Sequence, residues 1–249
     1  MTLNPWEELE KITGETIRPG GFAITEEALA FCRFPLGARI LDVGCGLGAT
    51  VRHLIERHGL DAVGIDASAQ MVERARKAAP WLPLRQGSGD NLPFYNGEMD
   101  GVLMECSFSL IKDADFALTE CYRVLKENGR LVISDFYYRR RPGVKTKETF
   151  MELLAEHGFI VELWRDCSQH LGQLTADCIM RGENPALLWQ CLLAKEENRG
   201  LTCAQLKEFK PGYFLLIARK PPIEHEAHAH EDQVLEHSCS GCGDAGEDE

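Results

Sequence analysis

The sequence has no apolar run that approaches the length of a membrane span, and its first ten residues are acidic and polar. A spanning helix needs about 20 consecutive apolar residues, and an export signal needs a basic start followed by an apolar stretch. We therefore expect no membrane partner, no secretory leader and a cytoplasmic location. The ten cysteines are scattered along the chain, so we expect free thiols rather than a disulfide framework.

Basic residues are also scarce, since 27 Lys and Arg stand against 39 Asp and Glu. Nine of these acids lie from Glu224 onward, and the chain before that point carries 27 basic and 30 acidic side chains. No basic stripe runs along the sequence, so we expect no nucleic-acid partner. We interpret the one basic cluster, at 139–147, as a solvated loop, with a guide for an anionic substrate as the alternative.

The most informative stretch is an apolar segment that runs into three closely spaced glycines. Residues 39–43 predict a buried parallel strand that carries Asp42 near its end. Gly44, Gly46 and Gly48 then allow positive φ angles and let a ligand lie against bare main chain. The spacing also fits a dinucleotide fingerprint, so this loop alone does not distinguish between cofactors.

Strands and amphipathic helices alternate along the rest of the chain. We expect strands at 39–43, 62–66, 82–86, 101–105, 130–135, 159–163 and 213–218, and helices at 25–32, 50–58, 68–78, 114–125, 147–157 and 186–195. Thr25 is expected to cap the first of these helices. The alternation predicts right-handed βαβ units and a mostly parallel sheet covered on both faces. Asp66 ends the second strand about 20 residues after the glycines, where a carboxylate can bind both hydroxyls of a ribose.

Four motifs in this order resemble the class I S-adenosylmethionine (SAM) dependent methyltransferases over about 18–220. They are the glycine loop, Asp66, the stretch 87–94 with the strand at 99–105, and the stretch 124–135. The resemblance implies a doubly wound, Rossmann-like α/β fold whose seven-stranded, mostly parallel sheet has the order 3-2-1-4-5-7-6, with strand 7 antiparallel. It implies a helical arm at 1–37, a methyltransferase domain at 38–220 and a helical insertion at 164–212 between strands 6 and 7. We interpret the insertion as a substrate cap, with a dimer contact as the rival.

The resemblance also implies a SAM site at the carboxyl ends of the strands. Asp42 would help to hold the methionine amino group, directly or through water, and Asp66 would hold the ribose. Ser88 stands where close relatives carry an aspartate that accepts from the adenine amino group, and its hydroxyl can still accept one hydrogen bond. Helix packing is the alternative role for Met71. The predicted cofactor-binding residues are Asp42, Gly44, Cys45, Gly46, Gly48, Asp66, Ala67, Met71, Ser88, Gly89 and Glu105.

Cys106 is the candidate catalytic residue, because the end of the fourth strand faces both the transferable methyl and the acceptor in this family. The stretch 106–113 partly resembles the arsenite methyltransferase branch, although the other cysteine motifs of that branch are not matched. Function and packing both remain open for Cys106. His170 is the one candidate base, and the scarcity of bases favours a soft or already nucleophilic acceptor.

From residue 221 the pattern stops, and the acidic tail at 221–249 cannot bury a core and is expected to be disordered. His228, His230, Cys239 and Cys242 could coordinate a transition metal there. The sequence thus predicts a SAM-dependent methyltransferase that acts on a small molecule, such as a thiol or arsenite. The alternatives are an NAD-dependent Rossmann oxidoreductase and a non-catalytic SAM-binding or metal-handling regulatory protein.

Overall fold

The computed structural model describes residues 16, 18–184, 186, 189–190, 192 and 195–223. Residues 1–15 and 17 of the predicted helical arm, the acidic tail from 224 with its four predicted metal ligands, and half of the helix predicted at 186–195 lie outside these residues. Within the part of the chain that is described, no helix combines the length and the apolar character that crossing a membrane requires.

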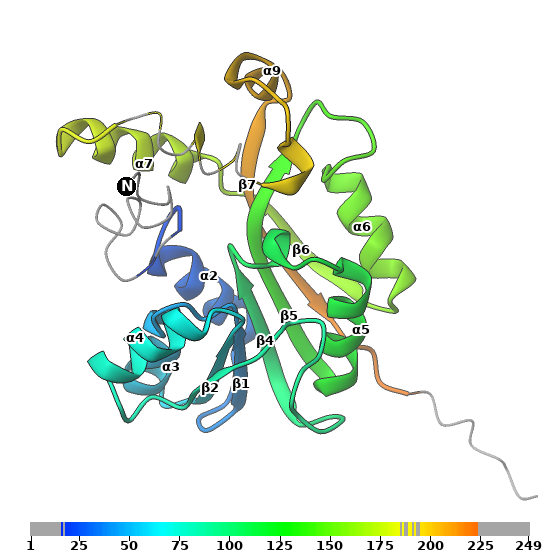
Figure 1. The fold of residues 1–249 in the computed structure, drawn as a ribbon. Coiled ribbons are helices and arrows are strands. Elements are labelled where there is room, and N and C mark those ends of the chain that lie inside the picture. The colour runs from blue at the N-terminus through cyan, green and yellow to red at the C-terminus, as the bar shows by residue number, and fades with distance from the viewer. Residues whose placement is uncertain are drawn as a thin grey trace, which may run out of the picture.

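A seven-stranded sheet in the order β3-β2-β1-β4-β5-β7-β6 forms the centre of the molecule (Figure 1). The strands are β1 (Arg39–Val43), β2 (Asp61–Asp66), β3 (Leu84–Gln86), β4 (Met99–Glu105), β5 (Leu125–Tyr138), β6 (Ile160–Asp166) and β7 (Pro211–Arg219). Strands β1 to β5 pair in parallel, whereas β7 runs antiparallel to both β5 and β6. The predicted strand order and the direction of the seventh strand are therefore confirmed.

Helices cover both faces of this sheet. They are α2 (Phe22–Cys32), α3 (Ala49–His58), α4 (Ala69–Ala78), α5 (Ala114–Val124), α6 (Lys147–Glu156), α7 (Gln169–Met180) and α9 (Cys203–Glu208). Alternate strand residues face opposite sides. Leu103 packs in the same buried cluster as residues of α2, α3 and α4, whereas its neighbours Val102 and Met104 pack with residues of α5 and α6. The two apolar faces of the central strands explain why both layers of helices form.

The start of α2 differs from the prediction. The helix begins at Phe22, after Gly20 and Gly21 with positive φ angles, so the prediction that Thr25 caps it is wrong. Thr25 lies one turn inside the helix, on the buried face beside Ala28. Because the two glycines allow the helix to begin three residues before Thr25, the Thr25 side chain is not needed as a cap. It makes a buried contact instead.

The fifth strand is longer than the predicted 130–135. It starts directly after α5, and its pairing with β4 shifts register between Met99 and Gly101. Asn128 has a φ of 61° within this irregular stretch. The residues between the predicted helix at 114–125 and the predicted strand at 130–135 are therefore part of β5, as an irregular stretch.

A buried ion pair anchors the insertion between β6 and β7 to the carboxyl edge of the sheet, above which α7 and α9 lie in Figure 1. Lys195 Nζ lies 3.4 Å from Asp135 Oδ1, and the two side chains are only 1% and 0% exposed. Lys195 also donates a hydrogen bond to Ser109 Oγ. Burial alone would raise the pKa of Asp135, but the charge of Lys195 and a backbone hydrogen bond from Ser109 lower it below its usual range.

We expect Lys195→Met to lower the free energy of unfolding by about 3–5 kcal/mol, because it leaves the buried Asp135 charged and without its ion-pair partner. Urea denaturation of the purified chain measures this change. The double variant Lys195→Met, Asp135→Asn should recover part of the loss. Lys126→Met is the matched control, since Lys126 pairs with Asp100 at the surface and should contribute at most about 1 kcal/mol. Equal effects of the two single variants would contradict an anchoring role.

Candidate functional site

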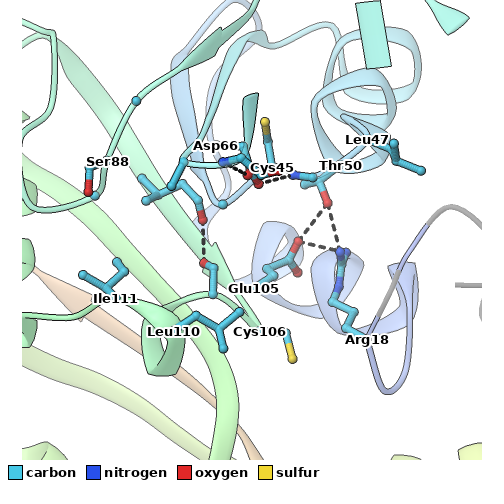
Figure 2. A pocket seen from close by; sticks show the side chains of 18 of the residues that line it. Arg18, Cys45, Leu47, Thr50, Asp66, Ser88, Glu105, Cys106, Leu110 and Ile111 are labelled. Atoms are coloured by element: carbon cyan, nitrogen blue, oxygen red, sulfur yellow. Dashed lines mark hydrogen bonds and ion pairs between the residues drawn. The ribbon is translucent and has the colours of Figure 1, made fainter. Parts of the chain in front are cut away.

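A cavity of about 490 Å³ opens at the carboxyl ends of β1, β2 and β4 (Figure 2). Its volume falls within the range of about 300–1,000 Å³ that is usual for small-molecule sites. The described residues that line it are Arg18, 43–47, Ala49, Thr50, 66–68, 87–90, 105–107 and 110–112. It thus lies at the edge where parallel α/β sheets bind their ligands.

The glycine loop forms one wall of the cavity from bare backbone. Gly44, Gly46 and Gly48 have φ angles of 79°, 52° and 80°, which glycine adopts most readily. A Cβ atom at Gly44 would lie 2.3 Å from Ser107 Cβ. Ser107 Oγ donates a hydrogen bond of 2.5 Å to the carbonyl of Val43 and so ties the end of β4 to the end of β1. Glycine is therefore required at position 44 both for its φ angle and for this close approach.

The carboxylate of Asp66 is held in a fixed orientation at the cavity wall. Its Oδ2 accepts from the backbone N–H of Gly46 and its Oδ1 from that of Ser68, both at 2.8 Å. A carboxylate offers about four acceptor positions, so two remain for a ligand. The same Ser68 caps α4 by accepting from Met71 N. The glycine turn and the start of α4 thus hold the Asp66 carboxylate in an orientation in which it can accept two further hydrogen bonds from a ligand.

A buried cluster of charged and hydroxyl groups forms another part of the wall. Arg18 Nη2 lies 2.8 Å from Glu105 Oε2, and the two side chains are 7% and 2% exposed. Thr25 Oγ1 donates to Glu105 Oε1 at 2.8 Å, and Thr50 Oγ1 donates to Glu105 Oε2 at 3.1 Å. Arg18 Nε has no hydrogen-bond partner among the described residues. In Figure 2 this pair and Ser88 lie on opposite sides of Asp66, so a ligand spanning the cavity would meet opposite charges at one end.

Asp42 lies behind the lining rather than in it. It is 3% exposed, and burial, reinforced by the neighbouring charge of Glu105, raises its pKa to about 8, although Arg18 acts in the opposite direction. At neutral pH most of this carboxyl group is therefore protonated. A cation bound nearby would lower this pKa and favour the ionised form.

Eight of the eleven predicted cofactor-binding residues line the cavity: Gly44, Cys45, Gly46, Asp66, Ala67, Ser88, Gly89 and Glu105. The other three are Asp42, Gly48 and Met71. A Cβ atom at Gly48 would lie 2.7 Å from Leu84 Cδ1, so Gly48 serves the packing of the loop against β3. Met71 is half-buried, and its Cε would lie 3.7 Å from a Cβ atom at Gly46.

Cys106 also lines the cavity, directly after β4. It is 6% exposed and has a φ of 61°, a left-handed conformation that is uncommon for residues other than glycine. Its backbone N–H donates to the carbonyl of Ser134 at 2.7 Å. Of the histidines in the described part of the chain, none lines the cavity. His170 instead lies beside Gly20, where an added Cβ atom would approach its Cγ to 3.0 Å.

Sequence reasoning overlooked Thr50, Leu110 and Ile111 as lining residues, and it misplaced Thr25. Spacing could have located Thr25, because it lies three residues after Phe22 and three before Ala28, on the apolar stripe of α2. A polar residue on such a stripe needs a buried partner, and Glu105 is that partner. The two apolar lining residues follow the fourth strand, at the end of a 3-10 helix of three residues (Phe108–Leu110), which is too short for periodicity to identify them.

A family model described as a methyltransferase domain matches residues 41–133. An O-methyltransferase of Pyrenophora dematioidea is 30% identical over 188 residues, which cover 67% of this chain and 70% of that protein. A demethylmenaquinone methyltransferase of Streptomyces avermitilis is 39% identical over 98 residues, which cover 39% of this chain and 42% of that protein. The chain thus spans less than half the length of the second relative.

A solved structure shares the fold. Phosphoethanolamine N-methyltransferase 2 of Haemonchus contortus, in complex with phosphomonomethylethanolamine and S-adenosylhomocysteine, aligns with a TM-score of 0.67 and 20% identity, covering 86% of this chain and 56% of that chain. At this identity the likeness establishes the fold alone. By its family match, its relative of similar extent and its sheet topology, the chain belongs to the class I SAM-dependent methyltransferases.

Proposed function

We propose that the chain transfers the methyl group of SAM to a small-molecule acceptor. The observation that carries this proposal is the fixed Asp66 carboxylate, which faces a cavity walled by bare glycine backbone and keeps two acceptor positions open. Two acceptor positions suit the two hydroxyls of a ribose. Membership of the methyltransferase family removes the basis for the NAD-dependent alternative.

The other lining groups suit the remaining parts of SAM. Ser88 and Gly89 would face the adenine, on one side of Asp66. The Arg18–Glu105 pair would meet the methionine end, with the guanidinium toward the carboxylate and Glu105 toward the ammonium. Asp42 would support that ammonium through water from behind. When bound, SAM supplies an electrophilic methyl group on a sulfonium sulfur, and the chain contributes orientation and exclusion of water.

The acceptor is proposed to be a soft nucleophile, such as a thiolate or trivalent arsenic. Such a group attacks without losing a proton to the protein, which suits a cavity whose described lining contains no histidine. Cys106 lies at the cavity wall where it can position such an acceptor. A small acceptor is also supported by the compounds named for two of the similar proteins, demethylmenaquinone and phosphomonomethylethanolamine.

Release of S-adenosylhomocysteine tests this function directly. Purified chain is incubated with SAM and, in separate reactions, with a thiol, arsenite plus thiol, a hydroquinone or an ethanolamine phosphate. We expect turnover with the thiol or with arsenite, and a loss on the order of 10²-fold in Cys106→Ser, as is usual when a positioning contact is removed.

The matched control is Cys121→Ser, a buried cysteine of α5 that does not line the cavity. SAM binding without product from any acceptor would favour the non-catalytic alternative. Turnover that is confined to the hydroquinone and unaffected by Cys106→Ser would assign Cys106 to packing.

Asp66→Ala should weaken SAM binding on the order of 10²-fold, because hydrogen bonds to a charged group contribute about 1.5–3 kcal/mol each. Isothermal titration calorimetry measures this change, after circular dichroism has shown that the variant is folded. Asp61→Ala is the matched control, since Asp61 begins the same strand and pairs with Arg39 at the surface. Equal SAM affinity in wild type and Asp66→Ala would contradict the ribose assignment.

Asp42→Asn should stabilise the chain in the absence of SAM, increasingly so from pH 5 to pH 8.5. The pKa of Asp42 is about 8 in the folded chain, against a usual value of 3.8. Between these values the unfolded chain binds fewer protons, so stability falls as the pH rises, by up to about 1.4 kcal/mol per pH unit. Thermal unfolding at several pH values measures the difference between variant and wild type. A difference that does not change with pH would contradict a raised pKa at Asp42.

A further inference from the structure

Three potential metal ligands converge on the surface formed by α2 and α3, away from the cavity lining. Glu26 Oε1 lies 2.5 Å from His53 Nε2 and 2.8 Å from His58 Nε2. The ligand atoms of all three residues lie within 4.8 Å of one another. These residues form no motif in the sequence, because Glu26 is 27 residues from His53 and belongs to a different helix.

The local structure holds the two imidazoles in place while leaving access from solvent. The ring of His53 stacks on Phe22, with centroids 4.1 Å apart and planes 13° from parallel. His58 is the last residue of α3, which Gly59 terminates in the left-handed conformation. The side chains of Glu26, His53 and His58 are 48%, 16% and 28% exposed. An ion could therefore reach the group and keep a water molecule as a further ligand.

We propose that Glu26, His53 and His58 form a binding site for a divalent transition-metal ion, with Zn²⁺ as the expected occupant. Two imidazole nitrogens and one carboxylate oxygen, with an open fourth position, are a common set of ligands for Zn²⁺. Donor atoms at about 2.0–2.2 Å from a tetrahedral ion lie about 3.4 Å from one another. The two separations from Glu26, 2.5 and 2.8 Å, would have to widen by about 0.6–0.9 Å to reach that arrangement. Cu²⁺ and Ni²⁺ suit the same nitrogen and oxygen donors.

The alternative explanation for the close approach of Glu26, His53 and His58 is that they are joined by hydrogen bonds alone, without a metal ion. The present distances allow each histidine to donate Nε2–H to Glu26. Burial acts against ionisation of Glu26, but the hydrogen bonds from His53 and His58 outweigh it and lower the pKa of Glu26. To bind an ion through Nε2, each neutral imidazole would carry its proton on Nδ1 instead, so the two hydrogen bonds to Glu26 would be exchanged for Nε2–metal bonds.

An ion at this site would join two helices that also contribute to the cofactor cavity. Thr25 precedes Glu26 on α2, and Thr50 lies one turn before His53 on α3. Both threonines donate to the buried carboxylate of Glu105. A cross-link at the surface would thus restrain the pair of helices that holds Glu105, and it should raise the thermal stability of the folded chain. The site itself does not depend on the proposed methyl transfer.

The test uses the full chain, with the four predicted tail ligands replaced through His228→Gln, His230→Gln, Cys239→Ser and Cys242→Ser. Zn²⁺ is titrated by calorimetry, and the midpoint of thermal unfolding is measured with and without excess Zn²⁺. We expect one Zn²⁺ per chain and a higher midpoint with Zn²⁺. Loss of a residue that only supports a metal ligand costs about 10–100-fold in metal affinity. Adding Glu26→Gln or His58→Gln removes a ligand itself, so it should reduce the affinity for Zn²⁺ by more than this. It should also abolish the shift in the midpoint of thermal unfolding.

His157→Gln is the matched control, because His157 follows α6 and its Nε2 lies 3.8 Å from Asp115 at the surface. It should leave both the affinity and the Zn²⁺-induced shift unchanged. Absence of the shift in the tail-substituted chain would overturn the proposal and leave a hydrogen-bonded cluster only. A shift that persists in both Glu26→Gln and His58→Gln would overturn it as well, since the ion would then bind elsewhere.

Discussion

The buried pair of Arg18 and Glu105 is the interaction on which the shape of the cavity at the carboxyl edge depends. It joins a turn that precedes α2 to the end of β4, and the hydroxyls of Thr25 and Thr50 bring α2 and α3 to the same carboxylate. Removing two charges from water costs several kcal/mol per ion, and only close pairing with further hydrogen bonds offsets this cost. Four separate parts of the chain are therefore held together by one carboxylate.

A second buried pair, Lys195–Asp135, has a similar arrangement at the end of the neighbouring strand β5. The body of the sheet is held by alternating apolar side chains that pack against helices on both faces. The irregular segments that approach the carboxyl edge have no such periodic pattern, and they attach through buried ions instead. The sheet and its helices therefore form an apolar scaffold, whereas the geometry of the carboxyl edge depends on a few specific polar contacts. It also explains why the edge can specialise for a ligand without changing the sheet.

Most of the fold followed from local patterns. The strand of apolar residues before Gly44, the Asp66 that ends the second strand and the apolar stretch of the seventh strand are short-range features, and each was placed to within about two residues, the usual uncertainty of element boundaries. The order of the strands and the direction of β7 came from the family resemblance, and the sheet confirms both. The division into arm, domain, cap and tail stays a prediction.

The sequence by itself determined the alternation of strands and helices, the glycine loop and the position of Asp66, because backbone conformation and apolar periodicity act over a few residues. The tertiary structure alone decided which polar groups meet. Thr25 turns inward to Glu105, Asp42 lies behind the cavity with a raised pKa, and Glu26 meets two histidines from another helix. Those outcomes depend on burial and on contacts between residues far apart in the chain, which set desolvation and pairing. Local spacing can show that Thr25 faces the core, but it does not show which polar group any of these side chains meets.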